Sequence, residues 1–446
     1  MPRTFLYTSE AVSEGHPDKV CDQISDAVVD AFLKQDPNAK TAVETAIKNN
    51  NVFLLGEINS TAILTQKDYE EIVRSTLLRI GYDDSVNSIS YKDFTLHVGL
   101  CAQSPDIAQA VHENKSIENT TAGDQGLMSA YATNETRSAM PSTFRLSCLL
   151  SKKMTELRKN NTLKWLRPDN KTQVTMQYFE DPEGRLYPQN IDTIILSTQH
   201  SDEVTNEQIR EQIFDQVIIP VLQEFERDDL ITFHNDSDYE DFDTEDFYKS
   251  LPQQQQDIIY RVKDKKVFQQ LKLLKPTTKI LINPSGRFII GGPMSDSGLT
   301  GRKIVCDAFG GWSAVGGGAF SGKDYSKVDR SAAYLARQIC KSIIKSGYAH
   351  RCSVQLSYAI GVADPISVYV DTYGFYDYRT PKGKAGIQSE AELAQLIRTT
   401  FRMRPGQIVV DFGLQRPIFE QLASYGHFGR DDLPIDEVRW EKIVVF

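Results

Sequence analysis

Residues 316–334 read GGGAFSGKDYSKVDRSAAY, a glycine-rich, lysine-bearing stretch that runs into a predicted helix. Gly317, Gly322 and Lys323 have the spacing of a P-loop, but Asp324 stands where a P-loop has the Ser or Thr that holds Mg²⁺. Glycines let backbone N–H groups approach phosphate oxygens, and a helix N-terminus favours anions. The stretch predicts a polyphosphate site, although by itself it fits a flexible glycine turn with solvated lysines equally well.

A second basic cluster lies shortly before this stretch. Residues 296–303 read DSGLTGRK and place Arg302 and Lys303 on another glycine-rich backbone. We expect a short strand over residues 304–308 between the two clusters. Two basic clusters around one strand indicate a convergent site for a multiply charged anion, which favours the polyphosphate interpretation.

The N-terminal residues 13–19, SEGHPDK, mark the start of a helix predicted over residues 18–33. His16 would lie beside the positive end of that helix, which favours a neutral imidazole or an anionic partner. Asp18 in the first turn either complements the helix dipole or holds Mg²⁺ against a polyphosphate. The later carboxylates, at four-residue spacing, are interpreted as a solvated face: Asp22, Asp26 and Asp30.

Composition limits the class of protein. A chain of 446 residues suggests about three domains, and its net charge of −10 argues against a general nucleic-acid binder. We expect no membrane span, since no run approaches 18 apolar residues, and no signal peptide. Six scattered cysteines indicate a reducing, cytoplasmic setting. Zinc-hydrolase, acyl-transfer and kinase motifs are missing from the sequence.

Hydrophobic periodicity predicts an α+β fold with antiparallel sheets and helices on one face. The expected strands cover residues 52–57, 94–100, 174–179, 193–198, 353–360 and 366–373, with strand-like residues 279–290 around a turn at 283–286. The expected helices cover residues 208–225, 328–346 and 390–401, and Ser326 and Asp329 suggest a capping box. Residues 227–276 are interpreted as a surface insertion, partly helical near 256–274 and disordered near 236–246.

Six motifs together resemble S-adenosylmethionine synthetase, also called methionine adenosyltransferase, over nearly the whole chain: SEGHPDKVCDQISDAVVDA, AGDQGLM, WLRPDNKTQV, STQHSDE, NPSGRFIIGGPMSDSGLTGRK and GGGAFSGKDYSKVDRSAAY. The resemblance implies synthesis of S-adenosyl-L-methionine from ATP and L-methionine. The methionine sulfur attacks ribose C5′ and expels the triphosphate, which is hydrolysed to diphosphate and phosphate. A thioether needs no general base, so such an enzyme mainly aligns the reactants and neutralises the leaving group.

The resemblance also implies an architecture and partners. It predicts three similar α+β domains with pseudo-threefold symmetry and mixed or antiparallel sheets, over residues 1–104, 118–285 (with the insertion at 227–276) and 286–446. It implies a homodimer or tetramer with active sites at the dimer interface, two Mg²⁺ per site, and K⁺. Nucleic acid and membrane are not expected partners.

Site residues carry over from the matching motifs. The resemblance implies catalytic roles for His16, Lys171, Arg302 and Lys323. It implies ATP contacts from these four and from Asp124, Asp169, Arg287, Phe288, Asp296, Lys303, Ala319 and Asp329, with Ile360 packing on the nucleotide. It implies methionine contacts from Glu57, Gln103, Asp296 and Lys327. It implies Mg²⁺ ligation by Asp18 and Asp329, with Glu10 as a further ligand, and K⁺ binding by Glu44.

Some positions depart from the family pattern. Val315 replaces a histidine before the glycine run, Thr121 replaces the first glycine of GAGDQG, and Ser129 and Ala130 replace Phe-Gly. Two other functions stay open at this point. A P-loop phosphotransferase would form ADP, but Asp324 opposes it. A regulatory paralogue without catalysis would have damaged metal or triphosphate positions, yet these positions are intact.

Overall fold

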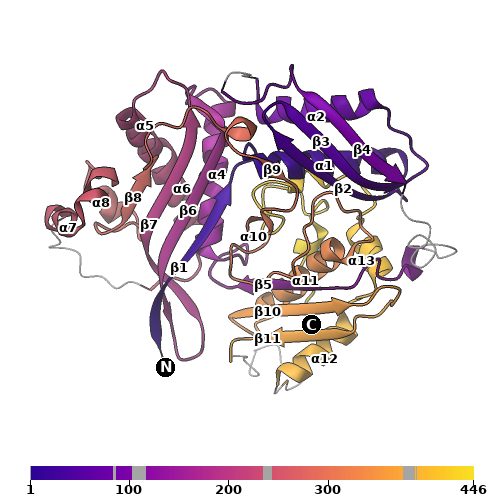
Figure 1. Cartoon of the computed structure of the whole chain (residues 1–446). Coiled ribbons are helices and arrows are strands. Elements are labelled where there is room, and N and C mark those ends of the chain that lie inside the picture. The colour runs from indigo at the N-terminus through magenta and orange to yellow at the C-terminus, as the bar shows by residue number, and fades with distance from the viewer. Residues whose placement is uncertain (1, 84–86, 103–116, 235–243, 375–386, 388) are drawn as a thin grey trace.

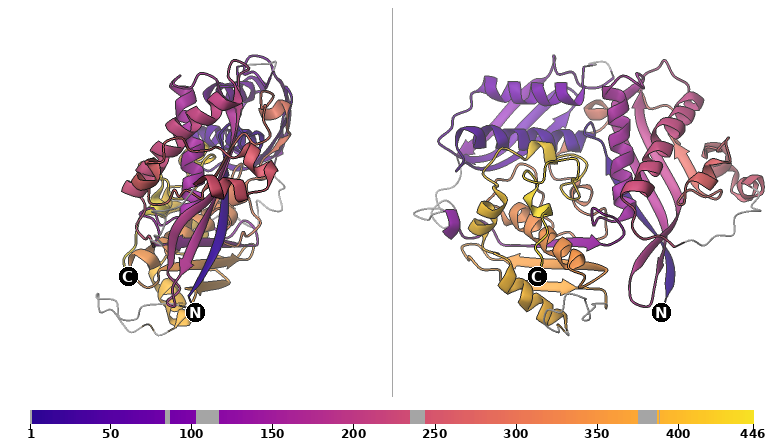
Figure 2. Two further views of the ribbon diagram at one scale, coloured as in Figure 1. Left: turned by 90° about the vertical axis from the view of Figure 1, so that its left-hand side faces the viewer. Right: turned by 180° about the vertical axis from the view of Figure 1, so that it is seen from behind.

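Three β-sheets, each covered by helices, make up the protein in a computed structural model that describes residues 2–83, 87–102, 117–234, 244–374, 387 and 389–446 (Figure 1). Seen from behind, the long helices lie in front of the sheets (Figure 2). The predicted α+β class with mixed or antiparallel sheets is confirmed. None of the described helices combines the length and the apolar character that crossing a membrane requires.

The first sheet has the strand order β4-β3-β2-β9. Its strands are β2 (Lys40–Lys48), β3 (Asn51–Asn59), β4 (Thr95–Ala102) and the short β9 (Gly298–Leu299). Strand β3 runs parallel to β4, and the other pairs are antiparallel. Helices α1 (Pro17–Gln35) and α2 (Gln66–Ile80) pack together, with α1 against β2. The helix and both strands predicted here are confirmed.

The second sheet has the order β1-β6-β7-β8. It contains β1 (Arg3–Val12), β6 (Leu166–Glu180), β7 (Leu186–His200) and β8 (Lys279–Ile282). Helix α4 (Ser142–Lys159) packs on β1 and β6. The predicted helix over 208–225 is one helical run: α5 (Asn206–Ile213), the π-helical η2 (Phe214–Ile218) and α6 (Ile219–Asp228). The predicted strands over 174–179 and 193–198 lie inside β6 and β7.

The strand expected over residues 279–290 is shorter than predicted, since β8 ends at Ile282. The predicted turn follows: Asn283 has a φ of 44°. Its side chain accepts from the Thr198 N–H at 2.8 Å and donates to the Thr198 carbonyl at 3.0 Å. These bonds to β7 replace the ladder that a longer strand would have formed.

The region expected to be an insertion is partly helical, as predicted. It contains α7 (Thr244–Ser250), α8 (Gln253–Ile258) and α9 (Val267–Gln270). Helix α7 covers the end of the segment expected to be disordered, while residues 235–243 lie outside the described part of the chain.

The third sheet has the order β11-β10-β5 and is antiparallel. Its strands are β5 (Gly126–Thr133), β10 (Arg351–Tyr358) and β11 (Ser367–Asp371). Its helices are α11 (Val328–Lys345), α12 (Glu390–Thr400) and α13 (Pro405–Phe412). The predicted helices over 328–346 and 390–401 and both predicted strands are confirmed. Short 3₁₀ turns complete the described chain: η1 (Ile117–Asn119), η3 (Gly292–Met294), η4 (Glu420–Leu422) and η5 (Arg439–Glu441).

Each sheet includes a strand from a distant part of the sequence. Strand β1 pairs with β6 along its whole length, β9 pairs with β2, and β5 pairs with β10. One hydrophobic core underlies the first and third sheets, and a second core underlies the sheet that contains β1. The three sheets are therefore tied together by the chain itself.

The short strand expected over residues 304–308 is wrong, because the structure has a helical turn there, α10 (Ile304–Asp307). Asp307 is 2% exposed and accepts a bond from the buried ammonium of Lys19 at 2.5 Å. This long-range pair lies 288 residues apart in the sequence, so local periodicity carried no signal for it.

The prediction that Asp22, Asp26 and Asp30 form a solvated face is also wrong. Their exposed fractions are 0%, 0% and 6%. Four-residue spacing does place them on one face of α1, but that face meets C-terminal loops whose buried N–H groups need acceptors. Asp22 accepts from the Gly301 N–H at 2.9 Å and from Lys19 at 2.9 Å.

Asp30 ends this row of carboxylates. It accepts from the backbone N–H groups of Phe419 at 3.0 Å and Glu420 at 2.9 Å. Burial raises the pKa of Asp30 to about 7, although these two hydrogen bonds lower it. The folded protein therefore holds this proton more tightly than the unfolded chain, whose carboxyl has a pKa of about 3.9.

The raised pKa predicts a pH-dependent stability. The contribution of Asp30 to stability should fall as pH rises from about 4 through 7, because the folded state loses a proton that it binds more tightly. Asp30→Asn cannot titrate. Relative to wild type, its free energy of unfolding should therefore rise by roughly 2–3 kcal/mol between pH 5 and pH 8. Urea unfolding at both pH values measures this difference. The exposed Asp202→Asn is the control; an equal difference at both pH values for Asp30→Asn would contradict the assignment.

Candidate active site

His16 is the N-cap of α1, where its Nδ1 accepts from the backbone N–H of Asp18 at 3.2 Å. Pro17 occupies the first helical turn, as predicted, since its fixed φ suits that position. Burial, reinforced by the charge of Lys303, lowers the pKa of His16 to about 4. The ring is therefore neutral near pH 7, and because Nδ1 accepts, the proton lies on Nε2, which can donate to an anionic oxygen.

Asp18 lies between two cations of the Arg302–Lys303 cluster. Its Oδ2 is 2.5 Å from the Lys303 Nζ, and its Oδ1 is 3.7 Å from the Arg302 Nε. The Leu299 N–H donates to Oδ1 at 3.0 Å. Burial would raise the pKa of Asp18, but the bonds from Lys303 and Leu299 outweigh it and lower that pKa. Asp18 is thus an ionised carboxylate fixed beside two basic side chains.

The pairing of β1 with β6 brings Glu10 and Lys171 to the same place. The Lys171 Nζ is 3.0 Å from a Glu10 carboxylate oxygen, and both side chains are partly exposed. The charge of Lys171 contributes to the lowered pKa of His16, which places it near the imidazole. Residues far apart in the sequence thus lie close together here.

Asp169, on β6, is a buried carboxyl next to the same cluster. It accepts from the Gly292 N–H at 2.8 Å. Burial raises the pKa of Asp169 to about 7; the Gly292 bond lowers it, and the carboxylates of Asp296 and Asp18 raise it further. Asp169 is therefore partly protonated near neutral pH and can donate as well as accept a hydrogen bond.

The residues around His16, Asp18 and Lys303 form one half of the candidate site, and a cavity of about 480 Å³ forms the other half. Four of the predicted site residues line this cavity: Glu44, Ala319, Lys323 and Asp329. Gln125, residues 300–301 and residues 316–318 also line it. The Lys323 Nζ is 2.5 Å from an Asp329 oxygen. At Gly318 a Cβ would come within 2.1 Å of the Asp329 Cγ, so the missing side chain leaves room for this carboxylate.

The two halves meet at β9. The Leu299 N–H binds Asp18 on one side, while Thr300 and Gly301 line the cavity on the other. The Thr300 hydroxyl accepts from the Thr45 N–H at 2.9 Å and lies 2.9 Å from the Ser25 hydroxyl. This short strand is therefore anchored to both α1 and β2.

Asp324, the residue that departs from a P-loop, is a buried structural carboxylate. It is 0% exposed and accepts from the backbone N–H groups of Thr41 and Ser326, each at 2.8 Å, and from Lys327 at 2.6 Å. Burial alone would raise its pKa, but Lys327 and Lys40 lower that pKa far below the usual range. Asp324 ties the glycine loop to β2 and does not face a phosphate site as a P-loop hydroxyl does.

The predicted capping box at Ser326 is wrong. Helix α11 begins one residue later, with Lys327 as its N-cap and no side-chain cap bond. Asp329 pairs instead with Lys323 across the loop, and Asp324 accepts the Ser326 N–H. Lys327 itself binds Asp324.

The remaining predicted site residues are spread more widely. Glu57 on β3 lies opposite Ala42, which lines the 480 Å³ cavity, and exposed Asp124 precedes Gln125 of the same lining. Phe288 exchanges hydrogen bonds with His200, while Arg287 and Ile360 are exposed. Within the described residues, no hydrogen bond or ion pair joins these three residues to either half of the site. Gln103 lies outside the described residues.

The departures from the family pattern have ordinary surroundings. Val315 is 39% exposed, Thr121 is buried, and Ala130 is a fully buried residue of β5, where Ser129 lies opposite Gln355. None of these positions contributes a charge to either half of the site.

Sequence reasoning missed Asp26 and Arg330, which form a buried ion pair at 2.6 Å beneath the glycine loop. The four-residue spacing of the aspartates was the available signal, but it did not show which surface covers that face. Arg330 lies within the stretch of residues 316–334 and had no motif of its own.

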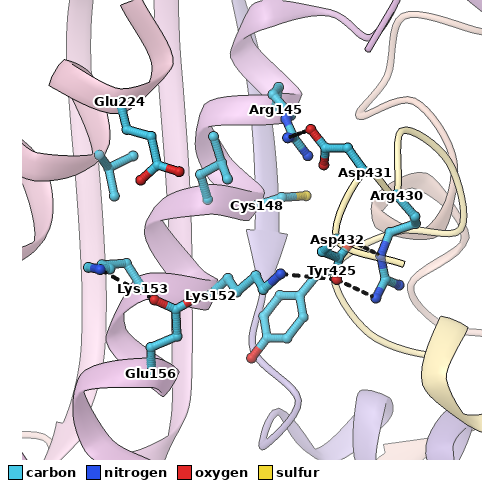
Figure 3. Close-up of a pocket in the computed structure, with 12 residues that line it drawn as sticks. Arg145, Cys148, Lys152, Lys153, Glu156, Glu224, Tyr425, Arg430, Asp431 and Asp432 are labelled. Carbon is cyan, nitrogen blue, oxygen red and sulfur yellow. Dashed lines mark hydrogen bonds and ion pairs between the residues drawn. The ribbon is translucent and has the colours of Figure 1, made fainter. Parts of the chain in front are cut away.

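A separate cavity of about 320 Å³ lies between α4, α6 and residues 425–432 (Figure 3). Ion pairs cross it: Arg145 to Asp431 at 2.5 Å, and Lys152 to Asp432 at 3.0 Å. None of the predicted site residues lines this cavity. The convergence of predicted residues is at β9.

Comparison with protein families gives three matches along the chain. The model described as S-adenosylmethionine synthetase, N-terminal domain, matches residues 4–105. The central-domain model of the same family matches residues 119–240, and its C-terminal-domain model matches residues 290–442. Both halves of the site lie within these matched ranges.

Proposed function

The chain belongs to the S-adenosylmethionine synthetase family and makes S-adenosylmethionine from ATP and L-methionine, and we propose that the two halves joined at β9 form its active site. The observation that carries this proposal is the pair of partly exposed lysines, Lys303 and Lys323, each held by a carboxylate beside glycine-rich backbone. Such an arrangement supplies preorganised positive charge for a polyphosphate.

The reaction requires alignment and charge stabilisation. The methionine sulfur forms a bond to ribose C5′ while the bond from C5′ to the triphosphate oxygen breaks, and the electron pair leaves with the triphosphate. No proton has to be removed from a thioether. Arg302, Lys303, Lys323 and Lys171 stabilise the charge on the leaving group. Neutral His16 donates from Nε2 to an oxygen near the bond that breaks.

The same cations hold the triphosphate after it leaves. Its hydrolysis to diphosphate and phosphate then needs only water and the charges already in place. One set of residues therefore serves both steps.

The family generally depends on Mg²⁺ and K⁺. Mg²⁺ takes one or two carboxylates and completes its shell with phosphate oxygens and water, and Asp18 and Asp329 are single carboxylates of this kind, the latter in the space that Gly318 leaves. We assign one of two Mg²⁺ to each, with Glu10 as a further ligand, and K⁺ to Glu44. Bound Mg²⁺ would neutralise triphosphate charge.

The substrate ends are assigned by position and resemblance. Methionine is assigned to Glu57, Gln103, Asp296 and Lys327, with Asp296 binding the ammonium group. The nucleoside is assigned to Asp124, Asp169, Arg287, Phe288 and Ala319, with Phe288 stacking on adenine and Ile360 packing on the nucleotide.

The working unit in this proposal is a homo-oligomer with active sites at the dimer interface. All three sheets carry exposed large apolar side chains: Leu6 at 55%, Leu55 at 49% and Leu127 at 41%. Neighbouring residues of β3, Val52 and Leu54, are fully buried, so Leu55 points away from the helices. An apolar surface spread over three sheets favours burial against a second copy.

The product assay tests the reaction. Incubation with ATP, methionine, Mg²⁺ and K⁺ should give S-adenosylmethionine with equimolar phosphate and diphosphate, measured by chromatography and phosphate assays. Omission of methionine is the control. Formation of ADP would indicate a phosphotransferase, and absence of any product with all four components present would indicate a regulatory paralogue.

Lys323→Ala should lower turnover at least roughly a hundredfold, because one preorganised charge on a developing anion contributes roughly 3 kcal/mol. Circular dichroism should show an intact fold, since Lys323 is on a loop and partly exposed. Near-normal turnover would refute its role at the triphosphate.

Gly318→Ala should displace the Asp329 carboxylate, because the new Cβ would lie 2.1 Å from the Asp329 Cγ. We expect a turnover at least roughly tenfold lower and a higher Mg²⁺ requirement, read from Mg²⁺ titrations of the rate. The matched control is Gly317→Ala, where no atom lies within 4 Å and φ is +89°. That change should reduce stability by about 1 kcal/mol with a smaller effect on the Mg²⁺ titration; equal titrations for both variants would contradict the assignment.

A further inference from the structure

Asp26 and Arg330 form an ion pair between α1 and α11 from which solvent is excluded. Both side chains are 0% exposed, and the Arg330 Nη2 donates to the Asp26 Oδ2 at 2.6 Å. Burial would lower the pKa of Arg330, but the charge of Asp26 outweighs it and raises that pKa. The guanidinium also lies over the Phe419 ring, 4.3 Å from its centroid. The pair is therefore charged and fixed in place.

Other atoms of this pair form hydrogen bonds with the backbone on both sides of Lys323. The Gly322 N–H donates to the Asp26 Oδ1 at 2.8 Å, and the Arg330 Nη1 donates to the Lys323 carbonyl at 2.9 Å. The Gly322 carbonyl accepts from the Val43 N–H at 2.9 Å. The backbone is thus held just before and just after the Lys323 Cα.

Gly322 is required for this close approach. Its φ is +82°, and a Cβ there would lie 1.8 Å from the Val43 carbonyl oxygen. A side chain at this position would therefore force the loop away from β2. With its backbone held here and its Nζ 2.5 Å from Asp329, Lys323 is positioned before an anion binds.

We propose that Asp26 and Arg330 are positioning residues that hold Lys323 in place for the triphosphate. The inference rests on the proposed role of Lys323. Displacement of a catalytic charge by about 1 Å is enough to lower a rate strongly, so fixing the lysine backbone contributes directly to the reaction. Neither residue contacts substrate; both act through Lys323.

A purely structural role is the competing explanation. Buried ion pairs are weak evidence for stability, since their desolvation penalty can exceed their attraction. The direction of the remaining bonds separates the two explanations. Asp30, one turn further along the same face of α1, is also buried, but its hydrogen bonds come from Phe419 and Glu420 and not from either lysine loop. It provides the matched comparison.

A double-mutant cycle tests the proposal in the full-length protein. Turnover and the methionine KM are measured for Asp26→Asn, Lys323→Ala and the double variant, with unfolding monitored by circular dichroism. Asp26→Asn should lower kcat at least roughly tenfold and leave the methionine KM within about twofold. Since Asp26 acts through Lys323, the double variant should have a kcat within about threefold of Lys323→Ala alone. Asp30→Asn, assayed at pH 8, should keep a kcat within about twofold of wild type.

Independent effects in the cycle, so that the two losses multiply, would overturn the proposal, as would wild-type turnover of Asp26→Asn or an equal loss in Asp30→Asn. Wild-type turnover of Lys323→Ala would refute the active-site assignment itself and this inference with it. If Asp26→Asn does not fold, Arg330→Lys replaces it in the same cycle. That change keeps the charge beside Asp26 but removes the fork that reaches the Lys323 carbonyl.

Discussion

Three aspartates on one face of α1 are the constraint on which the rest of the site depends. Each accepts a backbone N–H from a glycine-rich loop in the C-terminal part of the chain: Leu299 at Asp18, Gly301 at Asp22 and Gly322 at Asp26. Buried N–H groups require partners, and glycine-rich loops have no ladder to provide them. One helix from the N-terminal region thereby sets the paths of both basic loops and keeps them in register with each other.

The exposed fraction of each cationic side chain separates the charges that hold α1 against the C-terminal loops from the charges available to a substrate. Lys19 and Arg330 are 1% and 0% exposed and have fully buried carboxylate partners. Lys303 and Lys323 are 16% and 27% exposed and open onto the site. A chain with a net charge of −10 therefore concentrates positive charge at β9, where carboxylates offset it until an anionic substrate binds.

Local hydrophobic patterns predicted the long helices and strands well and the short ones poorly. The helix predicted over 328–346 appears as Val328–Lys345, and the strand predicted over 94–100 appears as Thr95–Ala102. The segment Ile304–Asp307 is a helical turn and not a strand, because Asp307 pairs with Lys19 from the other end of the chain. The pairing of β1 with β6 could not be predicted from local patterns either, because the paired residues are about 170 residues apart in the sequence.

The sequence by itself determined the α+β class, since helical and strand periodicities are local properties, and its motifs indicated the family and the candidate site residues by resemblance. It even determined that Asp18, Asp22, Asp26 and Asp30 share one face of a helix. Only the tertiary structure decided whether that face is solvent-exposed or buried, because its burial depends on which distant backbone packs against it. Asp26 and Arg330 are 304 residues apart in the chain and 2.6 Å apart in space. Their role follows from that packing, which no local pattern encodes.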